Sequence, residues 1–195
     1  MRKHTIAVAV ATVFGLSAPL WAAQKPATPK ARSSSQPKTA TASQASDQRF
    51  IKEAGEGGLA EVELGKLATE KASNPEVKKF GQRMVDDHSK ANDELKSLAQ
   101  QKNVTVPGEL GAKDKAAKDR LSKLSGAAFD RRYMALMVSD HSKDVSEFRQ
   151  ESQRGKDDDV KAFASKTLPT LEDHLKMARD IASKTGAVAT KGKKN

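Results

Sequence analysis

Three histidines stand in copies of one short sequence phrase, and this repeat is the strongest chemical signal in the chain. Each copy places a histidine directly after an aspartate and two residues before a lysine. The copies are Asp87-His88-Ser89-Lys90, Asp140-His141-Ser142-Lys143 and Asp173-His174-Leu175-Lys176. Neutral imidazole is the commonest metal ligand in proteins. The repeated phrase therefore indicates a binding site, and it specifies no reaction.

Hydrophobic periodicity predicts that amphipathic helices carry these residues. We expect long helices over residues 48–72, 75–102, 126–154 and 158–185, and a short helix over 114–124. The residues expected to bound them are Asp47, Asn74 and Ser125 as N-caps, and Gly155 and Gly186 after helix ends. Each histidine falls on the apolar stripe of a different long helix, and Glu61 falls on the stripe of the first.

The composition favours an all-α fold, because strand-forming residues are sparse and only 4% of the residues are aromatic. Four long helices joined by short first and last turns predict an antiparallel four-helix bundle with a short extra helix between helices two and three. The middle connection can either cross over or simply return. Gly55, Gly57 and Gly58 interrupt the first helix, so they either allow close helix contact or break it.

The four polar stripe residues are expected to meet in one central layer. Glu61, His88, His141 and His174 lie 13 to 16 residues after the predicted helix starts. At about 1.5 Å per residue, their depths in an antiparallel bundle agree within about 5 Å. These four residues are the candidate metal ligands, and the candidates for orienting them are Asp87, Asp140, Asp144 and Asp173. The alternative is a purely structural polar layer.

The ligand types narrow the choice of metal without deciding it. Imidazole with carboxylate suits zinc, iron or manganese. Met84, Met137 and Met177 lie three or four residues from a histidine, and thioether ligands would shift the choice toward copper. The methionines are equally interpreted as core filler. The sequence shows no nucleophile–base pair, phosphate-binding loop or zincin motif, so we assign no catalytic and no cofactor-binding residue.

Both flanks of the helical region are basic. Residues 1–23 have the charged start, apolar run and small-residue end of a secretory signal peptide, with cleavage expected after Ala22 or Ala23. The alternative is an uncleaved membrane anchor. We interpret residues 24–46 as a disordered basic linker, 47–185 as the folded domain and 186–195 as a basic tail.

The distribution of charge indicates which kinds of partner the protein is expected to bind. The net charge is +10, but all 25 acidic residues lie between Asp47 and Ser183, where an equal number of basic residues balances them. A folded domain without net charge argues against a nucleic-acid-binding protein. The basic flanks favour weak association with an anionic envelope surface. The absence of cysteine excludes disulfides and thiolate sites. After removal of the leader, no segment is apolar enough to span a membrane, so we expect a periplasmic protein.

Several motifs resemble an exported bacterial family called domain of unknown function 4142. They are the stretch from Gly57 to Ala68, Met84-Val85-Asp86-Asp87-His88, Phe129-Asp130 with Tyr133 and Met137, Asp140-His141, and Thr167-Leu168-Pro169 with His174. The resemblance covers about residues 47–181 and implies a ferritin-like bundle in a periplasmic or outer-membrane protein. It implies no established activity. Di-iron bundles carry Glu-x-x-His, whereas this chain has Val85, Val138 and Leu171 three residues before its histidines.

The leading functional hypothesis is a non-enzymatic envelope or stress-related protein that binds a metal ion. The first alternative is a metal-dependent oxidoreductase of ferritin-like type, which needs a redox metal with an open coordination position. The second is a structural interaction module that uses the Gly-rich face of the first helix. A structural module would keep its fold after all three histidines are changed.

Overall fold

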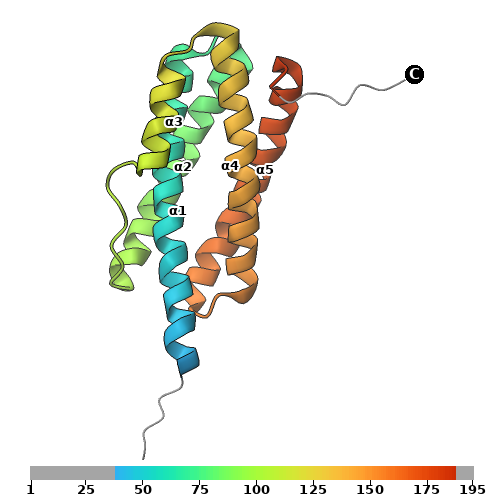
Figure 1. Ribbon diagram of the computed structural model, residues 1–195. Coiled ribbons are helices and arrows are strands. Elements are labelled where there is room, and N and C mark those ends of the chain that lie inside the picture. The colour runs from blue at the N-terminus through green and yellow to red at the C-terminus, as the bar shows by residue number, and fades with distance from the viewer. Residues whose placement is uncertain (1–37, 188–195) are drawn as a thin grey trace, which may run out of the picture. The chain divides into compact units, whose positions relative to one another are not determined.

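The computed structural model describes residues 38–187, and the secondary structure in that range is entirely helical. Figure 1 shows the five helices: α1 (Lys38–Lys71), α2 (Pro75–Gln101), α3 (Ala112–Ser122), α4 (Gly126–Arg154) and α5 (Asp158–Thr185). The predicted all-α class and the predicted short helix are confirmed. The predicted signal peptide, the linker up to residue 37 and the tail from residue 188 lie outside the described residues.

The four long helices form a bundle in which each helix runs antiparallel to its neighbours. α1 packs chiefly against α2 and α4 against α5, and contacts of α2 with α5 and of α1 with α4 complete the bundle. The connections at 72–74 and 155–157 are too short to allow anything but antiparallel hairpins. The loop after α2 and helix α3 carry the chain back along the bundle, so α4 starts at the same end as α2 (Figure 1). The middle connection is therefore a crossover.

Helix α1 starts at Lys38, inside the segment predicted as linker, rather than at the predicted position 48. Residues 38–46 contain no proline or glycine, so nothing in them breaks a helix that continues from the packed part. Asp47 is consequently an internal residue of α1 and not its N-cap. Its buried carboxylate Oδ2 instead accepts the backbone N–H groups of Lys156 (3.0 Å) and Asp157 (2.7 Å).

The other predicted helix boundaries are largely confirmed. The Asn74 side chain caps α2 by accepting the N–H of Glu76 at 2.8 Å, and Gly186 ends α5 with a left-handed backbone (φ 71°). Ser125 occupies the N-cap position of α4, but its side chain makes no capping hydrogen bond. The turn before α2 is held by buried Asp130 of α4, whose carboxylate accepts hydrogen bonds from the backbone and hydroxyl of Ser73.

A polar layer divides the apolar core into two clusters. One cluster contains Met84 of α2 and Met137 of α4, and the other contains Leu95 of α2 and Val145 of α4. The histidines lie between these positions along each helix. Six buried side-chain atoms of residues 38–187 have no hydrogen-bond partner, and four of them belong to Glu61 and the three histidines, while the other two are Tyr133 Oη and Glu151 Oε1.

The glycines of α1 and α2 permit close packing without breaking either helix. α1 continues through Gly55, Gly57 and Gly58. A Cβ on Gly58 would collide with the Asn92 side chain, whereas a Cβ on Gly57 would have no atom within 4 Å. The backbones of α1 and α2 approach closely farther along, where a Cβ on Gly65 would lie 2.7 Å from the carbonyl oxygen of Gly81 and a Cβ on Gly81 would lie 2.9 Å from that of Gly65. Close helix contact, rather than a break, is thus the outcome.

Glu151, which lies near the buried Asp47, makes the stability of the folded state depend on pH. It is 8% exposed, and burial together with the neighbouring Asp47 carboxylate raises its pKa to about 7. The pKa in the unfolded chain is near its usual value of about 4.3. The folded state therefore binds this proton more tightly, so the stability that it contributes is full below about pH 4 and is lost as pH rises through 7.

We expect Glu151→Gln to stabilise the protein at pH 8 by about 1–3 kcal/mol, because glutamine cannot ionise beside Asp47. At pH 4.5 the wild-type carboxyl is protonated in the folded state and roughly half ionised in the unfolded chain, so the difference should shrink to about 0.5 kcal/mol. Urea unfolding at the two pH values measures both quantities, and the exposed Glu70→Gln variant is the control. An equal effect at both pH values would contradict the assignment of the buried proton to Glu151.

Candidate metal centre

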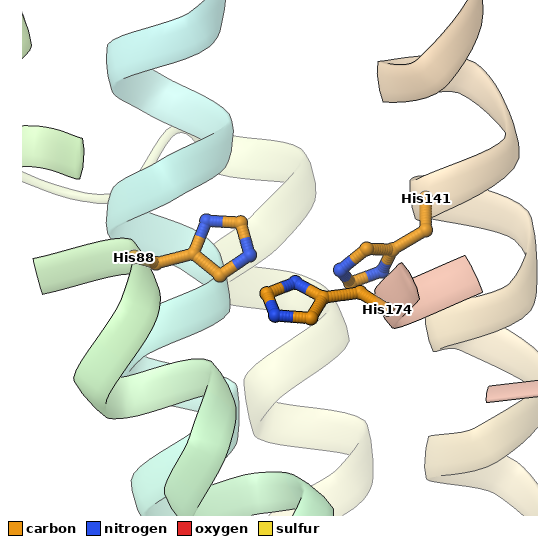
Figure 2. Close-up of side chains that lie close together, drawn as sticks. All are labelled: His88, His141 and His174. Carbon is orange, nitrogen blue, oxygen red and sulfur yellow. The ribbon is translucent and has the colours of Figure 1, made fainter. Parts of the chain in front are cut away.

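Three imidazole rings meet in the polar layer, one each from α2, α4 and α5 (Figure 2). The ring centroids of His88, His141 and His174 lie 5.4 to 5.6 Å apart. One nitrogen of each ring lies within 4.8 Å of a nitrogen of both other rings. The helical stripes that the sequence predicts thus bring all three histidines to one point.

Hydrogen bonds fix the tautomers of two of the rings. His141 Nδ1 lies 3.0 Å from the carbonyl oxygen of Met137, one turn earlier in α4. A carbonyl only accepts, so Nδ1 carries the hydrogen and Nε2 carries the lone pair. His174 Nε2 lies 2.9 Å from Asp87 Oδ2. Partial burial raises the pKa of Asp87, but hydrogen bonds from His174 and Arg83 outweigh it and lower the pKa, so this carboxylate accepts and His174 Nδ1 keeps its lone pair.

The nitrogens left over are buried and have no hydrogen-bond partner among the described residues. They are His88 Nε2, His141 Nε2 and His174 Nδ1. His88 is 7% exposed and the other two histidines are fully buried. A buried polar atom without a partner costs about 1–3 kcal/mol. Three such atoms in one layer are an expensive arrangement for a layer that serves only packing.

Burial also keeps these rings neutral. It lowers the pKa of His141 to about 4, with the nearby His174 adding to the effect. Burial and the two neighbouring rings lower the pKa of His88 well below its usual value. Burial lowers the pKa of His174 as well, although its hydrogen bond to Asp87 opposes the shift. At neutral pH the rings therefore present lone pairs rather than positive charge, as a metal ligand must.

Aromatic and apolar side chains shield one side of the site. The Phe80 ring lies 6.2 Å from His141 and 6.5 Å from His174, in edge-to-face geometry. Met84 and Met137 pack in the adjacent apolar cluster. The sulfur of Met177 takes an N–H from Arg83 at 3.5 Å. Met84 and Met137 are therefore core residues, and the Met177 sulfur already accepts a hydrogen bond. The shielding role of Phe80 was not predicted, because the sequence marks it only as a stripe residue.

Glu61, the fourth predicted ligand, is buried beside the histidines but is not part of the group of three. Its Oε1 lies 3.7 Å from His141 Nδ1, on the side that faces the Met137 carbonyl. Its Oε2 has no hydrogen-bond partner among the described residues. Burial, followed by the charges of Asp144, Asp140 and Asp114, raises its pKa well above the usual value. Glu61 thus lies next to His141 and is not one of the three clustered residues.

The four aspartates predicted to orient the ligands have different positions. Asp87 holds a histidine, although it is His174 of α5 rather than its sequence neighbour His88. Asp173 is largely exposed and lies 4.0 Å from Arg83. Asp140 and Asp144 face a cavity that they share with Glu61. Burial is the main cause that raises the pKa of Asp140, and it raises the pKa of Asp144 to about 7.

Comparison with known families identifies the family of this chain. Residues 31–181 match the family described as domain of unknown function DUF4142. The chain belongs to this family. The match includes all three histidines, Glu61 and Asp87, and it begins before the start of α1. The family has no established activity. No curated protein matches the chain.

Two solved structures share the fold of this DUF4142 protein. One is a DUF305 protein from Streptomyces coelicolor, named as a predicted secreted protein, with a TM-score of 0.63 at 14% identity. The similarity covers 76% of this chain and 97% of that one. The other is a DUF305 fragment from Deinococcus radiodurans, with a TM-score of 0.63 at 11% identity over 71% of this chain and 96% of that one.

Between residues 38 and 187, no helix combines the length and apolar character that crossing a membrane requires. The residues three positions before the histidines also lack the carboxylates of a di-iron site. Val85 and Val138 are half-buried, and Leu171 is buried in the second apolar cluster. The ferritin-like label stays a prediction.

Proposed function

We propose that this protein binds one late first-row transition-metal ion, Zn²⁺ or Cu²⁺, through His88, His141 and His174. The observation that carries the proposal is the set of three buried, neutral imidazoles whose free nitrogens have no other partner among the described residues. A metal ion supplies the partner that all three lack. No polar protein atom in the described region does so.

The ligand set supports these metals over harder ones. Imidazole suits zinc, copper, iron and nickel, and affinities for a nitrogen site rise along the first row to a maximum at copper. Manganese and iron sites use more carboxylate oxygen, but Glu61 lies outside the group of three. Asp87 adds one negative charge behind His174. A carboxylate in that place fixes the ring orientation and makes imidazole a stronger ligand.

The site needs only a small contraction to bind an ion. Zinc–nitrogen bonds of about 2.0–2.1 Å in tetrahedral geometry place ligand nitrogens about 3.3 Å apart. The present separations are at most 4.8 Å. Side-chain rotation of about 1 Å per ring therefore closes the site without moving helices. Three protein ligands leave a fourth position for water or another small ligand.

The biological setting that we propose is the bacterial envelope. The predicted signal peptide and the name of the Streptomyces coelicolor neighbour support export. A protein that holds one metal ion in a buried, non-catalytic site would sequester or carry that ion in the periplasm. This role accounts for the expected stress-related function, because it limits free metal at the cell surface.

The proposal is tested by the metal content of the exported protein, purified without a His tag. Elemental analysis should find about one equivalent of zinc or copper per chain. The triple variant His88→Leu/His141→Leu/His174→Leu should contain none while keeping its helical circular dichroism. Wild-type protein that is isolated metal-free, and that takes up neither ion on dialysis, would refute the proposal. The histidine layer would then have a structural role only.

Asp87→Asn should weaken Zn²⁺ binding by about 10–100-fold, the usual loss when a carboxylate behind a histidine ligand is removed. Asparagine offers His174 a neutral acceptor and can turn its NH₂ toward the ring. Asp173→Asn is the matched control, because Asp173 directly precedes His174 but is largely exposed. Isothermal titration of both variants measures the difference. Equal losses in the two variants would show that local charge, rather than the hydrogen bond, matters.

A further inference from the structure

An acidic cavity lies beside the metal centre, between α1, α3 and α4. Its volume is about 260 Å³, and its lining contains seven carboxylates but only two lysines. The folded region as a whole carries equal numbers of acidic and basic residues. Acidic groups are therefore concentrated at this cavity relative to the folded region as a whole. Clefts lined by one sign of charge concentrate ions of the opposite sign.

The inner wall of the cavity contains a carboxylate that lacks a partner. Glu61 lines the cavity, is 2% exposed, and has an Oε2 atom with no hydrogen bond among the described residues. Asp140 and Asp144 line the same wall, and no lysine or arginine of the described chain pairs with either. The nearby Lys143 is paired with Glu147 at 2.7 Å. Glu61 is buried, Asp140 and Asp144 are half-buried, and burial raises the pKa of all three because a charge without a partner is costly there. A bound cation would supply that partner in place of the proton.

A second, smaller cavity lies between this wall and His88. Its volume is about 20 Å³, enough for one water-sized species. It shares Gly57 and Asp144 with the acidic cavity, and its lining includes His88. A Cβ on Gly57 would meet no atom within 4 Å, so the glycine leaves open space at the junction. The two cavities thus adjoin at Gly57 and Asp144, and the smaller one extends to His88.

We propose that the acidic cavity is an outer cation site, in which Glu61, Asp140 and Asp144 capture a hydrated divalent metal ion that then passes Gly57 to the three histidines. This inference rests on the proposed metal binding. Carboxylate oxygens hold late transition metals more weakly than imidazoles do. The ion therefore exchanges water for carboxylate oxygen first and for imidazole nitrogen next, moving toward the stronger ligands without any change of oxidation state.

Stopped-flow mixing of the full chain with Zn²⁺ in the presence of a chromophoric zinc indicator tests the route. Asp140→Asn/Asp144→Asn keeps side-chain size, and should slow the association rate by about tenfold or more and reduce its dependence on salt. Gly57→Leu should fill the junction and slow association and dissociation together, leaving Kd within about threefold of wild type. Glu172→Gln/Asp180→Asn, on a different face, is the control and should associate at the wild-type rate.

The outcomes separate this inference from the proposed function. If both cavity variants associate within twofold of the wild-type rate and retain its Kd, the outer site is refuted while the histidine site stands. If wild-type protein does not bind Zn²⁺ at all, both proposals fail. Circular dichroism checks that Gly57→Leu folds. Should it misfold, the aspartate pair decides alone, with slowed association supporting the outer site and unchanged association refuting it.

Discussion

Replacing His88 by leucine is expected to weaken transition-metal binding by roughly two to three powers of ten while making the metal-free protein more stable. Zinc sites with four ligands bind with about 10–16 kcal/mol, so one ligand contributes about 3–4 kcal/mol. The free His88 Nε2 is buried without a partner, and removing it relieves a cost of about 1–2 kcal/mol. Leucine has a similar volume and is compatible with the apolar surroundings.

A loss of metal affinity together with a gain in the stability of the metal-free protein is expected only if the histidine layer binds a metal ion. Titration with Zn²⁺ measures the affinity, and urea unfolding in the presence of a chelator measures the stability of the metal-free protein. A layer that served packing alone would instead lose stability when His88 is changed, with no metal effect. Loss of stability in the metal-free state, together with unchanged metal affinity, would contradict the account.

Gly81→Ala is expected to destabilise the protein by about 2–4 kcal/mol, although alanine is the better helix former by about 1 kcal/mol. The added Cβ would lie 2.7 Å from Ala68 Cβ and 2.9 Å from the Gly65 carbonyl oxygen. Neither atom can move aside by a side-chain rotation, because the Ala68 Cβ is bonded directly to the helix backbone and the Gly65 oxygen is part of the backbone. α1 and α2 must therefore separate, which loosens the packing on both sides of the crossing.

Gly57→Ala is the matched control for this prediction, and it should stabilise the protein by about 0.5–1 kcal/mol. It makes the same substitution on the neighbouring helix, where the new Cβ meets no atom within 4 Å. Only the helix-propensity gain remains there. Denaturant unfolding of the two variants gives the comparison. A stabilising Gly81→Ala would show that the close approach of α1 and α2 is not needed for packing.

The convergence of the histidines could be predicted from the sequence because a helix has a fixed rise per residue. Counting from the starts of α2, α4 and α5 places His88, His141 and His174 at similar depths, and the apolar stripes direct them inward. The same counting predicted Glu61 near the histidines, although α1 starts at Lys38 and not at the position 48 used for the count. It could not supply the rotation of α1 about its axis, which puts Glu61 behind His141 instead of among the three rings.

Contacts between helices that are distant in the chain could not be predicted. Asp87 precedes His88, so a local pattern associates the two, yet the packing of α2 on α5 gives its carboxylate to His174. Asp47 has the residue type and position of an N-cap, but the helix extends past it and its carboxylate caps the turn before α5. In both cases the side chain has the expected chemistry and a partner that only the tertiary structure determines.

The most direct test of the account is X-ray absorption spectroscopy of the metal-loaded protein. We expect a first shell with three imidazole nitrogens at about 2.0 Å and one oxygen from water or another small ligand, and the loss of one imidazole in the His88→Leu variant. A first shell made only of oxygen, or a spectrum that His88→Leu leaves unchanged, would contradict the central claim that these three histidines bind the ion.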